Sequence, residues 1–343
     1  MVPEPAASVL VVDDEGGVRD LMSRWLTSGG LSVTTAASAD EALGHLAVRP
    51  PAVALCDIRM PGHDGMWLAE RIRRSSPETA VIIATGVYDI GLAIDSLSQG
   101  VVDYLTKPFG RERLREAIAR GLEWHRAAWD ARRWRDTLEE ELQARRARLA
   151  SVMAMVRVDS EEAVDTMLAM ATVADLDARE HAHRVSDLAL RLAAALRMAP
   201  DAISPLRHAA LLHDIGKLAI PEAVMRKPAP LTGDEVAIVR RYPLIGSELV
   251  AAVPYLAGAA RLIADACERP DGRGYPRGAA AADVPAGARL IAVTDAFDVM
   301  THPRVYRDPL PVRDALLELE RCRGSQFDAS CVDALLALAR PAS

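Results

Sequence analysis

The first third of the chain alternates short apolar runs with stretches of helical periodicity. The runs typical of buried strands occupy residues 8–13, 53–56, 81–85 and 101–108. Between them, apolar residues recur at helical spacing, for example at residues 18–26, 39–47 and 65–74. Alternating strands and helices predict an α/β domain built on a parallel sheet.

Polar side chains stand where these strands end. Asp13 and Asp14 follow the first strand, and Asp57 follows the second. Because the carboxyl ends of parallel strands meet at one edge, these carboxylates should converge, and a hard cation such as Mg²⁺ relieves their repulsion. We therefore expect Mg²⁺ at this edge and Asp57 as the nucleophile in phosphoryl transfer. Lys107 would counter the phosphoryl charge, and the Thr85 hydroxyl would donate a hydrogen bond to it.

Residues 5–123 resemble the receiver domain of two-component response regulators, whose fold is a doubly wound parallel five-stranded sheet. The resemblance implies that Asp57 accepts a phosphoryl group and that a sensor histidine kinase is a partner. Asp13 and Asp14 match the family's Mg²⁺-binding positions. The other implied features are the carbonyl of Arg59 as a Mg²⁺ ligand, Thr85 and Tyr104 as the switch pair, and a peptide between Lys107 and Pro108 that is commonly cis.

A helical connector is predicted for residues 111–158, because proline is absent and the residues of high helix propensity Arg, Glu, Ala and Leu dominate. Within this stretch, five apolar residues recur at heptad-like spacing: Leu138, Leu142, Leu149, Val152 and Val156. One interpretation is a parallel coiled coil that pairs two chains into a homodimer. The alternative is a long helix packed on its own output domain.

Residues 159–343 consist mostly of amphipathic stretches at helical spacing, as in residues 186–196 and 207–220, which predicts an all-α domain. Separate stretches supply His181, the pair His213-Asp214, and Asp295. Imidazoles and carboxylates from several helices are typical of a hydrolytic metal site for Mn, Fe or Zn. The alternative is that these are structural histidines and a hydrogen-bonded helix end.

The motifs LLHDIGK (residues 211–217), DGRGYP (residues 271–276) and residues 292–307 resemble the HD-GYP family, metal-dependent phosphodiesterases acting on cyclic di-GMP. The resemblance spans about residues 160–340. It implies one Fe, Mn or other divalent metal on His181, His213, Asp214 and Asp295. Further implied roles are an extra carboxylate ligand at Asp177, a lysine near the scissile phosphate at Lys217, and cyclic dinucleotide binding at Asp298, Arg304 and Arg307. GGDEF-type proteins are implied partners.

Three positions depart from that family. Tyr242, Ala266 and Cys267 stand where it has histidines that complete a cluster of two or three metals. Three interpretations follow: a phosphodiesterase with a reduced metal site, a non-catalytic module that binds the nucleotide or a protein, or a single-metal phosphohydrolase acting on another nucleotide. The intact DGRGYP motif speaks against the last. Loss of a second metal should reduce diesterase activity strongly.

Composition restricts the number of domains, the kinds of ligand and the cellular compartment that fit this sequence. The 343 residues suffice for two to three domains, and aromatic residues make up only 4%, so the cores must be aliphatic. The net charge of −7 and the lack of a basic recognition helix argue against DNA binding. Four cysteines without a CxxC pair, no apolar run long enough to span a membrane, and no recognisable signal peptide together predict a cytoplasmic protein.

Overall fold

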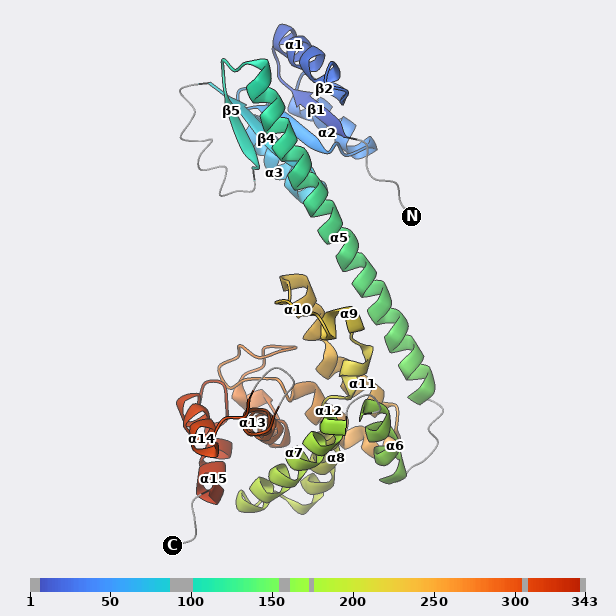
Figure 1. The fold of residues 1–343 in the computed structure, drawn as a ribbon, viewed down its shortest axis with the longest axis vertical. Coiled ribbons are helices and arrows are strands. Elements are labelled where there is room, and N and C mark those ends of the chain that lie inside the picture. Colours follow the sequence, from blue (N-terminus) through green and yellow to red (C-terminus); the bar gives the residue numbers. More distant parts are fainter. Residues whose placement is uncertain (1–6, 87–100, 154–160, 173–175, 304–307, 340–343) are drawn as a thin grey trace. The chain divides into compact units, whose positions relative to one another are not determined.

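The computed structural model describes residues 7–86, 101–153, 161–172, 176–303 and 308–339 (Figure 1). It divides into two compact units, residues 1–134 and 135–343.

The first unit is a five-stranded parallel sheet covered by helices. The strands, in the spatial order β2-β1-β3-β4-β5, are β1 (Ser8–Val12), β2 (Ser32–Ala36), β3 (Val53–Asp57), β4 (Ala80–Thr85) and β5 (Asp103–Thr106). The helices are α1 (Gly16–Thr27), α2 (Ala39–Val48), α3 (Gly65–Ser75) and the first part of α5 (Arg111–Met153). The predicted doubly wound α/β fold is confirmed.

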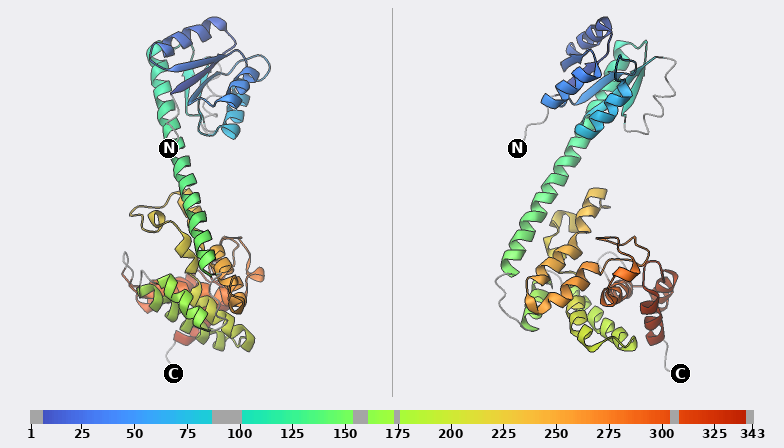
Figure 2. Two further views of the ribbon diagram at one scale, coloured as in Figure 1. Left: turned by 90° about the vertical axis from the view of Figure 1, so that its right-hand side faces the viewer. Right: turned by 180° about the vertical axis from the view of Figure 1, so that it is seen from behind.

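Strand periodicity divides the sheet's side chains between two cores. Helices α2 and α3 cover one face of the sheet, and α1 and α5 cover the other (Figure 2). Leu10 and Val12 of β1 belong to the core on the first face, whereas Val9 and Val11 belong to the core on the second. Both faces are therefore buried. Strand β3 is buried at all five positions, as expected for the centre of a parallel sheet.

Helix α5 is continuous over 43 residues, as the absence of proline predicted. Its first turns bury Leu114 and Ile118 against the sheet. Further along, Leu138 and Leu142 are buried in the core of the second unit. The leucines of the heptad-like stripe thus pack within the chain, which agrees with the second interpretation of the connector, and the homodimer stays a prediction. Val156 lies outside the described residues.

The second unit is helical, which confirms the predicted all-α domain. After the end of α5 it contains α6 (Glu161–Thr172), α7 (Leu176–Ala195), α8 (Ile203–Leu212), α9 (Glu222–Met225), α10 (Gly233–Val239), α11 (Tyr242–Ala251), α12 (Ala257–Asp265), α13 (Ala286–Thr301), α14 (Val312–Arg321) and α15 (Ala329–Ala339). Helix α7 packs against α8 and α13, and α11 against α12. Across the described part of the chain, no helix is both long and apolar enough to cross a membrane.

Candidate phosphorylation and metal sites

The strand ends of the first unit converge as predicted. Carboxylate oxygens of Asp13, Asp14 and Asp57 lie within 4.8 Å of one another. The Lys107 ammonium donates to Asp13 Oδ2 at 2.7 Å and lies 3.1 Å from Asp57 Oδ1. Burial raises the pKa of Asp57, and the nearby Lys107 only partly counters that effect. Three carboxylates against one ammonium leave a net negative oxygen cluster, which fits Mg²⁺.

The neighbouring groups define the surroundings of Asp57. Thr85 is fully buried, and its hydroxyl donates to the Gly86 carbonyl at 3.2 Å. The Lys107–Pro108 peptide is cis, as the resemblance implied. Gly65 is under a steric constraint that the sequence motifs did not reveal. A Cβ added there would lie 2.1 Å from the carbonyl oxygen of Asp57, so only glycine allows α3 to begin so close to the phosphorylation site.

In the second unit, a break between helices positions the His-Asp pair. Helix α8 ends at Leu212, His213 is its C-cap, and Asp214 precedes a short 3₁₀ turn over Ile215–Ala219. A Cβ on Gly216 would lie 1.9 Å from the Tyr242 carbonyl oxygen. The close approach of two backbones therefore fixes the turn that holds His213.

We expect the substitution Gly216→Ala to destabilise the second unit by about 1–3 kcal/mol, because the added methyl must displace backbone rather than a flexible side chain. Gly233→Ala is the matched control, since a Cβ at this first-turn position of α10 meets no atom within 4 Å. Urea unfolding followed by circular dichroism measures both. Equal stability of the two variants would show that the turn adapts to a side chain.

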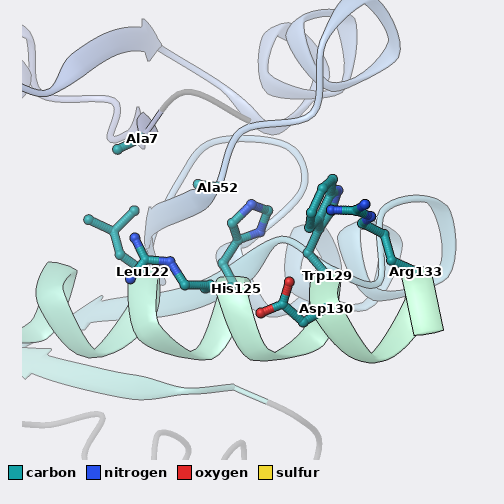
Figure 3. A pocket seen from close by; sticks show the side chains of 8 residues that line it. Ala7, Ala52, Leu122, His125, Trp129, Asp130 and Arg133 are labelled. Atoms are coloured by element: carbon teal, nitrogen blue, oxygen red, sulfur yellow. The ribbon is translucent and has the colours of Figure 1, made fainter. Parts of the chain in front are cut away.

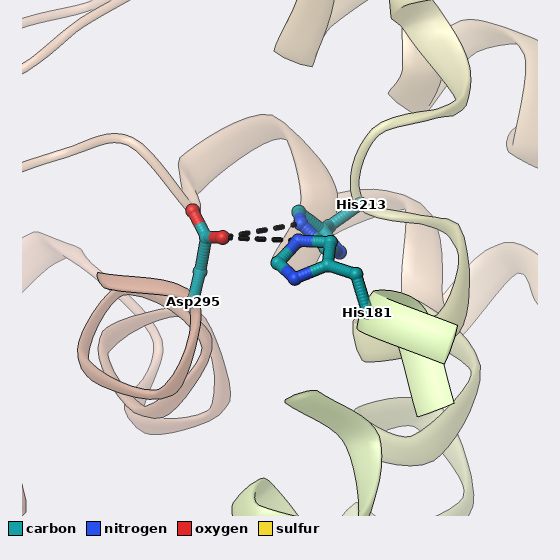
Figure 4. Close-up of side chains that lie close together, drawn as sticks. All are labelled: His181, His213 and Asp295. Carbon is teal, nitrogen blue, oxygen red and sulfur yellow. Dashed lines mark ion pairs between the residues drawn. The ribbon is translucent and has the colours of Figure 1, made fainter. Parts of the chain in front are cut away.

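Three of the four predicted ligands meet at one point (Figure 4). His181 comes from α7, His213 from the end of α8 and Asp295 from α13. Asp295 Oδ1 lies 3.2 Å from His181 Nε2 and 3.7 Å from His213 Nε2. Both imidazoles are buried, whereas the Asp295 side chain is 35% exposed. The cluster is thus open to solvent on the side of its carboxylate.

The hydrogen bonds of the two imidazoles suit metal binding. His181 Nδ1 lies 2.6 Å from Asp298 Oδ2, and His213 Nδ1 lies 2.8 Å from the Ala210 carbonyl oxygen. Because both partners accept, each neutral ring carries its proton on Nδ1 and turns the Nε2 lone pair towards Asp295. His213 Nε2 is buried without a hydrogen-bond partner among the described residues. Ligating histidines are held in this way, so the donor set fits a divalent cation.

The electrostatics agree with a positive charge at this point. Burial lowers the pKa of His213, but the nearby Asp214 and Asp295 outweigh it and raise that pKa to about 9. His181 at 3.2 Å and His213 at 3.7 Å overcome the effect of burial on Asp295 and hold its pKa far below the usual range. The cluster thus favours protonated imidazoles in the protein without metal, and a dication would take the place of those protons.

Asp214 lies beside this cluster rather than inside it. Its Oδ1 is 3.6 Å from His213 Nε2, and its Oδ2 accepts from Lys217 Nζ at 2.6 Å. The Lys217 side chain is 38% exposed, so its ammonium is both fixed by Asp214 and accessible. Among the described residues, Asp177 is exposed in the first turn of α7 and does not join the cluster. Arg304 and Arg307 lie outside the described residues.

Asp298, for which the resemblance implies nucleotide binding, holds His181 in the structure. It is 3% exposed. Besides His181, its carboxylate accepts from Arg184 Nε at 2.6 Å and lies 3.0 Å from His302 Nδ1. Burial acts to raise the pKa of Asp298, but hydrogen bonds from His181 and Arg184 lower it to about 2. Three side chains thus surround this carboxylate. Sequence reasoning also missed Arg184, although its position one helical turn after His181 was a signal.

We expect Asp298→Asn to weaken metal binding by about 10–100-fold, because the group that orients the His181 ring loses its charge. Isothermal titration with Mn²⁺ measures the affinity, and thermal melting of the metal-free protein reports folding. Ser330→Ala, which alters a hydrogen bond to a different carboxylate, Asp328, serves as the control. A destabilised Asp298→Asn protein that binds Mn²⁺ normally would limit Asp298 to a structural role.

The three replaced histidine positions form an uncharged cluster. The Tyr242 hydroxyl lies 3.0 Å from Cys267 Sγ, and the Tyr275 ring packs edge-on against Tyr242 at 6.4 Å. Burial raises the pKa of both Tyr242 and Cys267, so each keeps its proton at neutral pH. Ala266 offers no donor atom. The Lys217 ammonium lies 5.1 Å from the centroid of the Tyr242 ring, a cation–π contact at the border of the metal cluster.

Comparisons with known proteins agree with both sites. Residues 9–119 match the response regulator receiver domain, and residues 165–331 match the HD domain. The chain is 31% identical to the cyclic di-GMP phosphodiesterase response regulator RpfG of Xanthomonas campestris pv. campestris, over 96% of this chain and 87% of that protein. It is 28% identical to a cyclic di-GMP phosphodiesterase of Thermotoga maritima, over 96% of this chain and 90% of that one.

The two sites and the comparisons define a response regulator. More narrowly, the chain belongs to the family that joins an N-terminal receiver domain to a C-terminal HD domain, whose relatives include cyclic di-GMP phosphodiesterases.

Proposed function

We propose that this response regulator binds cyclic di-GMP on an HD domain that holds a single divalent cation, and that it hydrolyses the nucleotide far more slowly than a two-metal enzyme. The observation that carries the proposal is the Tyr242–Cys267 pair at 3.0 Å, which fills the region next to the His181, His213 and Asp295 cluster. A protonated phenol and a protonated thiol are poor metal ligands. One side of the site therefore keeps the metal ligands His181, His213 and Asp295. On the other side, Tyr242 and Cys267 pack against each other and supply no ligand.

The residues of the chain divide the remaining work. A bound cation supplies Lewis acidity and a more acidic water molecule. The exposed ammonium of Lys217, held by Asp214, attracts the negative phosphodiester and offsets its charge. Asp298 and Arg184 keep His181 in the orientation that ligation requires. With a single cation, no second metal ion stabilises the oxygen on the other side of the phosphodiester bond that breaks. This explains the slow turnover proposed here.

The receiver domain supplies the control. A receiver implies a histidine kinase as partner, and Asp57 is the proposed phosphoacceptor. Lys107 lies 3.1 Å from Asp57 Oδ1, close enough to neutralise part of the charge that phosphorylation adds. Phosphorylation would act on the output domain along α5, which is continuous from the receiver to residue 153.

The test is cyclic di-GMP binding and turnover by the full chain, loaded anaerobically with Fe²⁺ or Mn²⁺. We expect about one metal ion per chain, nucleotide binding, and slow turnover that Asp214→Ala abolishes. Ser330→Ala again serves as a control remote from the HD-domain site. Binding without any turnover would reduce the domain to a binding module. Hydrolysis of another nucleotide with no affinity for cyclic di-GMP would refute the proposal.

A further inference from the structure

A second site is present in the first unit, at the end of the sheet opposite Asp57. A cavity of about 310 Å³ lies between α5 and the residues that lead into two strands, Ala7 before β1 and Ala52 before β3 (Figure 3). The side chains of Leu122, His125 and Trp129 line it from successive turns of α5. Its volume is near the lower end of the range of ~300–1,000 Å³ that small-molecule sites occupy.

His125 carries a buried atom that needs a hydrogen-bond donor. Its Nδ1 lies 2.5 Å from the Glu78 carbonyl oxygen, which can only accept, so in the neutral ring Nδ1 holds the proton. Nε2 is then an acceptor, and it is buried with no hydrogen-bond partner in the part of the chain that the structure describes. The carboxylate of Asp130 lines the same cavity. The cavity thus offers a ligand the two carboxylate oxygens of Asp130, whereas His125 Nε2 has almost no accessible surface.

The remaining walls suit a planar anion. Trp129 presents an indole ring, and the Arg133 guanidinium lies 4.7 Å from its centroid. Arg126 lines the cavity as well, one turn before Trp129. Indole rings stack on nucleobases, and the guanidinium fork pairs with phosphate oxygens. Two arginines against one aspartate leave the lining with a net positive charge.

We propose that this cavity binds a guanine mononucleotide. The guanine ring has two neighbouring N–H donors, on N1 and on the exocyclic N2, which match the two oxygens of the Asp130 carboxylate. Adenine has only its amino group to offer. With the base on Trp129, the phosphate meets Arg126 or Arg133. A bound nucleotide would connect α5 to the residues that lead into β1 and β3, Ala7 and Ala52.

Isothermal titration of the full chain with GMP and AMP tests the proposal. We expect GMP to bind at least tenfold more tightly than AMP, and Asp130→Asn to remove that preference. Trp129→Leu should weaken GMP binding by tenfold or more. Trp124→Leu is the matched control, because Trp124 lies on the same helix, is 39% exposed and does not line the cavity. Labelling of Asp57 by a small phosphodonor checks that each variant retains a folded receiver.

Two results would overturn the proposal. One is the absence of GMP binding up to ~1 mM, a concentration at which even a weak site would be half filled. The other is GMP binding that Trp129→Leu leaves unchanged, since the nucleotide would then occupy another place, including the HD domain. Equal affinity for GMP and AMP would contradict the role given to Asp130.

Discussion

Asp57→Asn abolishes phosphoryl labelling of the receiver by a small phosphodonor such as acetyl phosphate. The expected loss exceeds about 100-fold, because an amide cannot serve as the nucleophile that the carboxylate provides. The substitution also removes one of the three carboxylates that converge within 4.8 Å, so Mg²⁺ binding should weaken in parallel. Intact-protein mass spectrometry detects the added phosphoryl group, and a Mg²⁺ titration measures the second effect.

Asp64→Asn makes the same chemical change in the same loop and serves as its control. Asp64 is exposed, and its Oδ1 accepts from the Trp67 amide as the N-cap of α3, a role that asparagine also fills. Labelling should therefore persist in Asp64→Asn. Labelling that persists in Asp57→Asn as well would mean that another carboxylate accepts the phosphoryl group, and the receiver site would have to be reassigned.

The convergence of Asp13, Asp14 and Asp57 could be predicted because strand ends are visible in a sequence. Asp13 and Asp57 directly follow or end buried apolar runs, and parallel topology brings such ends together. Strand β2 could not be found in the same way. It lies at the sheet edge and reads SVTTA, with only Ala36 buried, so it lacks the apolar run of a central strand.

The leucines of the connector show a limit of periodicity. Heptad-like spacing indicates that one face of the helix is buried, but it does not identify the surface against which that face packs. In the structure Leu138 and Leu142 are buried in the core of the HD unit. Ion pairs flank this contact, with Arg241 Nη1 at 2.7 Å from Glu139 and Arg135 Nε at 2.9 Å from Asp234. Neither partner could be inferred from the stripe itself.

Asp298 shows the corresponding limit for a site residue. It follows the ligand Asp295 by three positions on α13, a spacing that fits a ligand-binding role as well as a supporting one. Only the packing of α13 against α7 decides between them, because it places His181 and Arg184 against the carboxylate. The sequence pointed to the proposed ligands, but the group that orients His181 depends on how two helices meet.

The combined substitution Tyr242→His, Ala266→His and Cys267→His should raise metal content from one to two ions per chain and cyclic di-GMP turnover by about 100-fold or more. It replaces the neutral Tyr242–Cys267 hydrogen bond with three imidazole donors beside the existing cluster. It also replaces the phenol ring that Lys217 contacts with an imidazole. Elemental analysis after anaerobic loading and single-turnover assays measure the two effects.

Tyr242→Phe distinguishes the effect of added metal ligands from the effect of looser packing in the site. It removes the hydroxyl that contacts Cys267 at 3.0 Å and supplies no donor, so it should leave metal content at one ion and turnover low. A second metal without faster turnover would locate the defect in nucleotide positioning rather than in ligation. Metal content that stays at one in the triple variant would show that the backbone around α11 and α12 no longer holds these positions at ligand distance. The Gly216 contact with the Tyr242 carbonyl argues otherwise, because it fixes the first turn of α11 directly against the turn that carries His213.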